Sequence, residues 1–465
     1  MRVRIRPHHI EHQLSALRHV LPTCEKSPTS SNFDAEVCEV PWANRMRLPR
    51  SLAAALYQNH QPIQSRPIFN METPSFRPKR VLILTKLTRY EFEKKTNKGI
   101  DDSQLVDVLK KRGSDYNNLL EKHKVHHSYL KTLQAELKNA GVESRLVDRF
   151  AYTQQSVDWA DAVFSAGGDG TFLMAASRIH SREKPVIGIN TDPQGSEGYM
   201  CLIRKLPEDH LKSALQRLFS GDFQWLFRQR IRITVNGELG EVIELHDQQL
   251  NRNPATTRWT DNPRSPGETD YKSISPPLCK KSKAASSMTT VELPVLALNE
   301  VFVGESLSSR VSYYEIGINN EKMVKQKSSG ITVCTGTGST SWYFNINKLT
   351  EQCVVDLMKI ISDKCKVSLP EANADTISDI CTVFNQQLIF APDCQKMAFS
   401  VRDPVFNSTF LPTDPRGFAD RIRIKSRGYD AHLVVDGGVS YRFNDGSDCL
   451  MEVHEEDALR TVVFR

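Results

Sequence analysis

The chain has 465 residues, a length expected for about three domain-sized units or for two domains with tails. Apolar residues make up 39% of it, below the ~45–50% of a typical globular domain, so part of the chain is not expected to pack. No run of 18 apolar residues occurs, which excludes a membrane-spanning helix. The net charge of +6 is concentrated in residues 1–79 and 251–290, and the remainder is mildly acidic. We therefore expect neither a nucleic-acid nor a membrane partner.

Two segments are not expected to join the fold. Residues 1–79 are rich in Pro, Ser and Arg, and their first twenty residues hold four arginines and one acidic residue. This start is typical of a mitochondrial presequence, and a disordered basic tail is the alternative. Residues 251–290 contain five prolines and few large apolar groups, so they predict a disordered insertion. The ten cysteines form no Cys-x-x-Cys pair and no zinc-like Cys/His spacing, which favours free thiols in a reducing compartment.

Alternating strand and helix signals predict a Rossmann-like α/β domain over residues 80–225. Short apolar runs are typical of buried parallel strands. Leucines at helical spacing before Gly141 predict a long helix. We expect strands at 80–85, 144–147, 162–166 and 185–190, and helices at 103–140 and from residue 171 onward. This alternation indicates a mostly parallel sheet.

Residues 226–465 predict a β-rich, β-sandwich-like domain. Residues 230–235 alternate charged and apolar side chains, Asn236-Gly237 is typical of a two-residue turn, and 240–245 fits the returning strand of a hairpin. Further strands are expected at 295–303, 311–318, 330–334, 397–401, 421–424, 432–435 and 440–443, with one helix at 349–362.

A glycine-rich turn between the strand 162–166 and the next helix is the strongest functional signal. It reads Gly-Gly-Asp-Gly-Thr over residues 167–171. Glycines let phosphates approach backbone N–H groups, and a helix N-terminus adds oriented donors. Asp169 would repel phosphate, so its presence indicates a proton acceptor or a Mg²⁺ ligand. The alternative is that Asp169 only caps the helix.

Two familiar phosphate-binding classes are excluded. No Gly-Lys pair occurs, so there is no Walker A loop. The His-Arg-Asp and Asp-Phe-Gly motifs of protein kinases are also missing.

Polar residues next to predicted strands form a second constellation. Asn299-Glu300 interrupts an apolar run, and buried strands rarely accept such a pair without partners. Ribose hydroxyls or a base edge would supply them, and a solvent-facing strand end is the alternative. Residues 335–342 combine two glycines, five hydroxyl side chains and Trp342, whose ring could lie against a base or ribose. For the turn at Asp436-Gly437 we favour a β-turn in which the aspartate caps the backbone.

These motifs, in this order, resemble the NAD kinase family, which transfers a phosphoryl group to the 2′-hydroxyl of the adenosine ribose of NAD. The resemblance runs from about residue 80 to the C-terminus, and it rests on residues 167–171, 188–190, 198–199, 299–300 and 337–342. The first motif alone is shared with lipid kinases and phosphofructokinases. Residues 190–198, 325–330, 334–339, 344–347 and 435–438 resemble the mitochondrial branch of the family.

The resemblance implies roles for particular residues. Asp169 would accept the proton, and Tyr199 stands where bacterial members have a Phe that borders the dinucleotide. The nucleotide-binding residues it implies are Gly167, Gly168, Gly170, Thr171, Asn190, Tyr199, Asn299, Glu300, Thr337, Gly338, Ser339, Thr340, Ser341, Trp342 and Asn345. No metal-ligating residue is assigned.

The resemblance also implies substrates, location and topology. NAD would lie between the two domains, ATP with Mg²⁺ would be the donor, and inorganic polyphosphate stays open as an alternative donor. The last strands would return to the first domain. The mitochondrial branch implies the mitochondrial matrix.

Two departures from the bacterial pattern stand out. Trp342 replaces a Tyr, and Ser329 replaces an Asp of a segment near the subunit interface of bacterial tetramers. The loss of that charge predicts a homodimer instead of a tetramer.

Two other functions stay open. A lipid kinase of the diacylglycerol type shares the glycine turn, but the second motif that usually accompanies it, Pro-x-Gly-Thr-Gly-Asn-Asp, is missing here. A non-catalytic NAD(P)-binding sensor would have no need of a base at Asp169.

Overall fold

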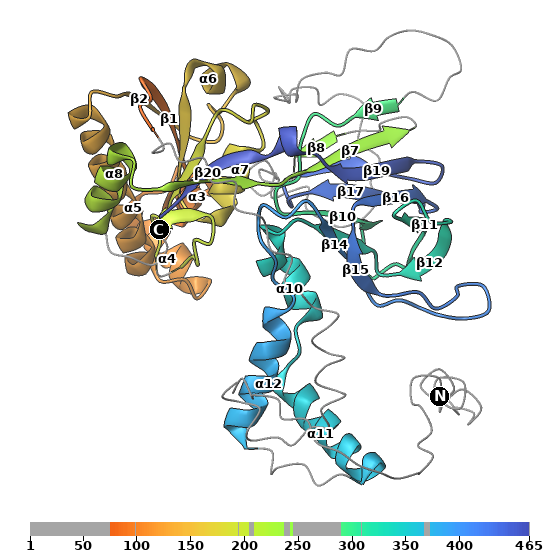
Figure 1. The fold of residues 1–465 in the computed structure, drawn as a ribbon. Helices are drawn as coiled ribbons and strands as arrows, with labels where there is room; N and C mark the ends of the chain where they lie inside the picture. Colours follow the sequence, from red (N-terminus) through yellow and green to blue (C-terminus); the bar gives the residue numbers. More distant parts are fainter. Residues whose placement is uncertain are drawn as a thin grey trace, which may run out of the picture. The chain divides into compact units, whose positions relative to one another are not determined.

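The computed structural model describes residues 75–464 apart from Lys98, Gln194, Ser308 and the segments 204–208, 237–241, 245–289 and 367–372. The expected presequence and nearly all of the expected insertion at 251–290 lie outside these residues. The described chain folds into an α/β half and a β-rich half, joined by strands that lie side by side (Figure 1).

The α/β half is built on one parallel sheet with the order β2-β1-β3-β4-β5. Its strands are β1 (Arg80–Thr85), β2 (Glu143–Val147), β3 (Ala162–Ala166), β4 (Val186–Ile189) and β5 (Cys201–Ile203). Its helices are α3 (Arg89–Thr96), α4 (Asp102–Lys111), α5 (Tyr116–Asn139), α6 (Gln154–Trp159), α7 (Asp169–Ala176) and α8 (Asp209–Ser220). The expected parallel α/β domain is therefore confirmed.

The side chains of β1 point alternately to the two faces of this sheet, and helices cover both faces. Val81 and Ile83 pack against α5 and α8, while Leu82 and Leu84 pack against α6 and α7. Successive strand residues point to opposite faces, so a wholly apolar strand needs cover on both sides.

The long helix expected at 103–140 is two helices. Gly113, with φ of +73°, leaves the first helix in a left-handed conformation, which glycine adopts at no steric cost. The side chain of Asp115 then accepts the N–H groups of Asn117 and Asn118 and begins α5. The leucine spacing was correct, and the break between the helices was missed.

The β-rich half is a sandwich of two antiparallel sheets. One has the order β15-β14-β13-β10-β17-β18-β8 and the other β12-β11-β16-β19-β7-β9. Their strands are β7 (Ile231–Asn236), β8 (Val242–Glu244), β9 (Thr290–Glu292), β10 (Glu300–Glu305), β11 (Ser312–Ile318), β12 (Val324–Ser328), β13 (Ile331–Cys334), β14 (Met397–Val401), β15 (Arg416–Ala419), β16 (Arg421–Ser426), β17 (Ala431–Val435), β18 (Val439–Arg442) and β19 (Asp448–Val453). Val301 and Leu433 of the first sheet share a core with Ile316, Ile424 and Met451 of the second.

The hairpin expected around Asn236-Gly237 is wrong. Strand β7 pairs with β19 and β9 in one sheet, whereas β8 pairs with β18 in the other. The chain therefore changes sheets between these two strands, and local turn chemistry cannot reveal such a crossing.

The two halves share strands at their junction. Strand β6 (Gln224–Arg228) pairs with β20 (Leu459–Val463), the last strand of the chain. Val462 packs in the core beneath α5 and α8, so the chain returns to the α/β half, where Figure 1 shows β20 near α7. Phe76, which precedes the expected start of the fold, is also buried there, with its ring 6.0 Å from that of Phe219.

Three further helices follow β13. They are α10 (Trp342–Asn347), α11 (Glu351–Cys365) and α12 (Ala374–Gln386). Helix α11 corresponds to the helix expected at 349–362, and α12, which was not expected, packs on it through Ile377 and Cys381. Within the described ranges, no helix combines the length and apolar character needed to cross a membrane.

Candidate functional site

The order β2-β1-β3-β4-β5 has its switch point between β1 and β3, where successive strands are added in opposite directions. In open α/β sheets, ligands bind outside the carboxyl ends of the strands at this point. Lys86 follows β1, the glycine turn follows β3, and Asn190 and Asp192 follow β4. The topology therefore gathers these groups at one edge of the sheet.

The three glycines of the turn have different roles. A Cβ on Gly167 would lie 2.7 Å from Thr171 Cβ, and one on Gly168 would lie 2.5 Å from Ser196 Oγ. Packing therefore requires glycine at both positions. A Cβ on Gly170 would meet nothing within 4 Å, so glycine there leaves free space beside the first turn of α7.

Asp169, in the glycine turn, also binds the loop that contains Tyr199 and Met200. Its two carboxylate oxygens accept the backbone N–H groups of Tyr199 and Met200 at 3.1 and 2.9 Å. The residue that caps α7 is Gly168, which supplies no side chain. Asp169 is therefore not the cap of its helix. Its carboxylate is partly exposed and each oxygen retains a lone pair for a further donor.

Asn190 shapes the loop after β4. It is fully buried, its Nδ2 donates to Ser196 O at 3.2 Å, and its Oδ1 accepts from Asp192 N at 3.1 Å. The structure therefore shows Asn190 as a support of the loop that carries Tyr199. The side chain of Tyr199 itself is 45% exposed.

Lys86 is a cation that sequence analysis missed. Its Nζ lies 3.2 Å from Asp192 Oδ2, and its side chain lies next to Gly167. The sequence did contain a signal, namely a lysine directly after the first strand. Because β1 and β3 are adjacent and parallel, this position lies beside the turn that follows β3.

Asn299 and Glu300 lie at the start of β10, held by a third acidic residue. Asp436 accepts the N–H groups of Leu298, Asn299 and Glu300 at 2.8, 2.7 and 3.0 Å. Asp436 stands in the turn after β17, with φ of +48°. Asp436 thus caps the backbone from a turn, as sequence analysis favoured, and the backbone that it caps belongs to a distant segment.

This arrangement presents two buried oxygen atoms that lack hydrogen-bond partners, Asn299 Oδ1 and Glu300 Oε2. Burial, and secondarily the charge of Asp436, raises the pKa of Glu300 to about 8. Burial also raises the pKa of Asp436 to about 6, against the opposing effect of its three N–H donors. Unsatisfied buried acceptors cost free energy, and a ligand with hydroxyl donors would satisfy them.

The loop 335–342 packs directly on this pair. Gly338 lies against the backbone oxygen of Asn299, where a Cβ would collide with it. Ser341 Oγ accepts from Asn299 Nδ2 at 3.1 Å. Ser339 is fully buried and donates to Gly336 O at 2.7 Å, so it supports the loop.

Thr337 links the loop to strand β6. Its Oγ1 accepts from Arg228 Nη1 at 3.3 Å, while Thr340 bonds only to the backbone of Thr337. Arg228 was not singled out in the sequence, because nothing local marks the end of β6 as part of a site.

Trp342 and Asn345 belong to α10, which follows the loop. The ring of Trp342 lies 5.2 Å from that of Phe302 and 5.1 Å from the guanidinium of Arg402. Asn345 bonds to Ser341 O and to Lys348.

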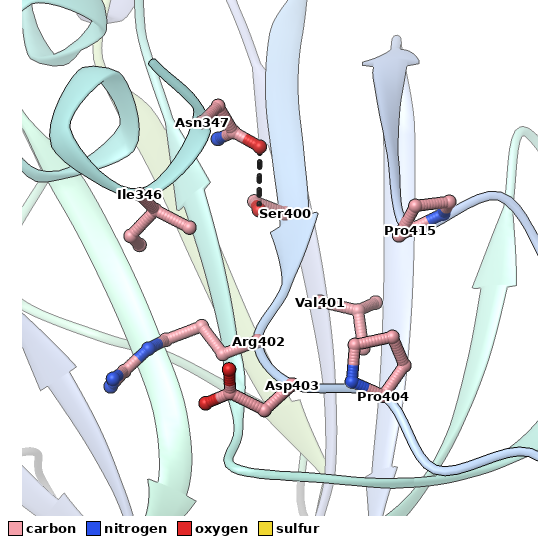
Figure 2. Close-up of a pocket in the computed structure, with 8 residues that line it drawn as sticks. All are labelled: Ile346, Asn347, Ser400, Val401, Arg402, Asp403, Pro404 and Pro415. Carbon is pink, nitrogen blue, oxygen red and sulfur yellow. Dashed lines mark hydrogen bonds between the residues drawn. The ribbon is translucent and has the colours of Figure 1, made fainter. Parts of the chain in front are cut away.

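Beside α10 opens a cavity of about 390 Å³, within the size range of small-molecule sites. It is lined by Ile346, Asn347, Ser400, Val401, Arg402, Asp403, Pro404 and Pro415. Figure 2 shows Asn347 and Ser400 joined across the cavity's edge by a 3.3 Å hydrogen bond between α10 and β14.

The glycine turn and the Asn299-Glu300 pair converge at the junction of the two halves. Leu298, next to Asn299, is buried in the same core as Phe172 of α7 and Met200. Cys201 of β5 donates from its Sγ to Gly167 O at 3.9 Å. The structure therefore brings together the two constellations that lie some 130 residues apart in the chain.

Comparison with known proteins assigns the family. Human mitochondrial NAD kinase 2 is 42% identical over 393 residues, which cover 84% of this chain and 85% of the human protein. The chain belongs to the NAD kinase family. The mitochondrial NAD kinase 2 of Xenopus tropicalis is 41% identical and is covered over 91% of its length. The family model described as the ATP-NAD kinase N-terminal domain matches residues 102–223, which include the glycine turn.

More distant members and solved structures are also similar. An NAD kinase of Citrifermentans bemidjiense is 23% identical over 55% of this chain. Yeast NADH kinase complexed with NADH is 13% identical, with a TM-score of 0.44 over 84% of each chain. The family assignment depends on the vertebrate relatives and not on this structural similarity.

Proposed function

We propose that this protein is an NAD kinase that transfers the γ-phosphoryl group of ATP to the 2′-hydroxyl of the adenosine ribose of NAD, forming NADP and ADP. The observation that carries this proposal is the pair of unpartnered acceptors, Asn299 Oδ1 and Glu300 Oε2, at the junction that also holds the glycine turn. A ribose offers hydroxyl donors to such acceptors.

The donor phosphates would bind over the glycine turn. Gly170 leaves space for them, the N-terminus of α7 supplies backbone N–H groups, and Lys86 supplies a positive charge. Lys86 would exchange its ion pair with Asp192 for a phosphate oxygen. This is our proposed role for a residue that sequence analysis did not select.

Asp169 would take the proton of the attacking hydroxyl. A ribose hydroxyl is a weak nucleophile at neutral pH, so removal of its proton as the new bond forms lowers the barrier. The two backbone N–H groups that Asp169 accepts hold its carboxylate in one orientation, which a catalytic base requires.

The residues present fit a bound Mg²⁺. This ion prefers one or two carboxylates together with substrate phosphates, and Asp192 is a carboxylate at this edge of the sheet. Asp192 would hold it, and the ion would offset negative charge on the transferring phosphoryl group.

The loop 335–342 would hold the acceptor nucleotide. Ser341 bonds to Asn299, Gly338 lies against its backbone, and Ser339 supports the loop. We assign Thr337, Thr340 and Trp342 of the same segment to the nucleotide as well. Trp342 is partly exposed and offers a flat apolar face to a base or ribose.

The direct test is incubation of the protein with ATP, Mg²⁺ and NAD, followed by an enzymatic assay for NADP. Parallel reactions contain NADH as acceptor, inorganic polyphosphate as donor, or diacylglycerol as acceptor. We expect NADP from NAD and no phosphorylated lipid. Binding of NAD without turnover would identify a sensor, and lipid phosphorylation would identify a lipid kinase.

The finer proposals concern location and assembly. We propose the mitochondrial matrix, supported by the Arg-rich N-terminus and the mitochondrial relatives. Fusion of residues 1–60 to a fluorescent reporter should direct it to the matrix, and a cytosolic signal would contradict this. We also propose a homodimer, because Ser329 lacks the charge of the bacterial interface, and light scattering should give twice the chain mass and not four times.

A further inference from the structure

Three side chains with metal-binding atoms meet between helices α3 and α5. His123 and His127 are one turn apart on α5, and Glu91 belongs to α3. Glu91 Oε1 lies 3.3 Å from His127 Nε2 and 4.0 Å from His123 Nδ1. One ligand atom from each residue lies within 4.8 Å of the other two. In the described ranges, no other group brings three such side chains together.

One hydroxyl group orients two of the three side chains. Thr88 Oγ1 donates to Glu91 Oε2 at 3.0 Å, so in its 2.9 Å contact with His123 Nδ1 the imidazole is the donor, and metal binding at Nδ1 would move that proton to Nε2. The other carboxylate oxygen, Oε1, is the atom that faces both histidines. Hydrogen bonds that hold ligand side chains in place are a regular part of metal sites, and their loss typically weakens metal binding.

We propose that Glu91, His123 and His127 form a binding site for a divalent transition-metal ion, with Zn²⁺ as the expected ion. Zinc takes imidazole nitrogen and carboxylate oxygen at about 2.0–2.2 Å, commonly with three protein ligands and a water in the fourth position. Small side-chain rotations would bring the three groups to that distance. All three are partly exposed, so solvent can supply the water and the ion can enter.

The donor set separates this site from the magnesium chemistry of the reaction. Mg²⁺ prefers oxygen ligands, whereas imidazole suits zinc and its neighbours in the first transition series.

The position of the site connects it to the catalytic edge of the sheet. Helix α3 follows β1 after three residues, one of which is Lys86. On α5, His126 lies between the two proposed ligands and bonds to Thr85 and Thr191, at the ends of β1 and β4. A bound ion would tie α3 to α5 directly behind these strand ends and so restrict the movement of Lys86.

The test compares zinc affinity between variants of the full chain, by competition with a chromophoric chelator in excess Mg²⁺. His127→Ala removes a ligand that contacts Glu91 and the rings of His123 and His126. Glu91→Gln removes the carboxylate, and a glutamine at this position preserves the capping box. We expect each variant to bind Zn²⁺ at least about tenfold more weakly than the wild type, the loss seen when only a supporting group of a site is removed.

His454→Ala is the matched control, because His454 also stands near two carboxylates, Glu452 and Glu456, but without a second histidine. Its zinc affinity should equal that of the wild type. X-ray absorption at the zinc edge should show nitrogen and oxygen ligands with an imidazole signature. Unchanged affinity in both His127→Ala and Glu91→Gln, or a sulfur ligand at the bound ion, would overturn the proposal.

Discussion

Asp436 and Glu300 are two partly buried carboxyl groups joined through the backbone, because the N–H of Glu300 donates to Asp436 Oδ1 at 3.0 Å. Glu300 begins β10, and Asp436 follows β17, the strand that pairs with β10. Asp436 fixes the backbone at the start of β10, and its charge adds to the effect of burial on the side chain of Glu300. One aspartate therefore positions the proposed ribose ligand and, after burial, contributes to its raised pKa.

The raised pKa of Glu300 makes stability depend on pH. Its pKa is about 8 in the folded chain, against an ordinary value of 4.5 for a glutamate in water, so the folded state binds more protons between these values. The contribution of this carboxyl group to the free energy of unfolding is then fully present below about pH 4.5 and is lost as the pH rises through 8. Glu300→Gln has no group that titrates here, so the variant does not lose this stability. We expect its Tm, measured without nucleotide, to exceed that of the wild type by several degrees at pH 9 and to differ less at pH 5. A difference independent of pH would contradict the shift.

Asp436→Asn tests the positioning of Asn299 and Glu300. The amide nitrogen of asparagine cannot accept a hydrogen bond. One or two of the three hydrogen bonds from backbone N–H groups are therefore lost, and the side-chain NH₂ group faces a backbone N–H group. Each unsatisfied group costs about 1–3 kcal/mol. We expect a lower Tm and a KM for NAD that rises more than the KM for ATP, because only the NAD ligands are displaced. Equal changes in both KM values would contradict this positioning role.

Asp169→Asn tests the proposed base, and the structure changes how the variant must be controlled. Asparagine keeps one acceptor for the two N–H groups of Tyr199 and Met200, so some stability is lost as well as the base. We expect turnover to fall by about 10²–10⁴, with little change in NAD affinity.

Asp161 offers a matched control at the other end of β3. Its carboxylate also accepts two backbone N–H groups, from Lys79 and Arg80 at 2.8 and 2.9 Å, but far from the switch point. Asp161→Asn should lower the Tm while leaving turnover near the wild-type value. Loss of a general base should lower turnover by at least about 10². If Asp169→Asn keeps more than about a tenth of wild-type turnover, Asp169 is not the base.

The glycine turn predicts opposite effects for two substitutions. A methyl group at Gly170 enters open space on a helix, where alanine is favoured over glycine by about 1 kcal/mol. Gly170→Ala should therefore fold with an unchanged or higher Tm, yet its KM for ATP should rise about tenfold, equivalent to about 1.4 kcal/mol of lost binding.

Gly167→Ala should instead destabilise the fold. Its methyl group would collide with Thr171 and press on Lys86, and overpacking of this kind costs about 1–3 kcal/mol. We expect a lower Tm by differential scanning calorimetry. If Gly170→Ala instead left the KM for ATP unchanged, the space beside Gly170 would not be the phosphate site.

The sequence predicted much of the fold because its signals were local. The apolar run 162–166 and the strand 397–401 match β3 and β14 residue for residue. Strands such as β12 and β15 were missed because their sequences are polar on one face and short. The hairpin at Asn236-Gly237 failed because its two strands belong to different sheets.

The sequence by itself determined the chemistry of the glycine turn and the residue types of the Asn299-Glu300 pair, since both are contiguous motifs with a strand beside them. Only the tertiary structure decided that Lys86 lies beside the turn, that Asp436 holds Asn299, and that Glu91 meets His123 and His127. Each of these contacts joins residues far apart in the chain. Such contacts are set by strand order and helix packing, which depend on the whole core and leave no local pattern in the sequence.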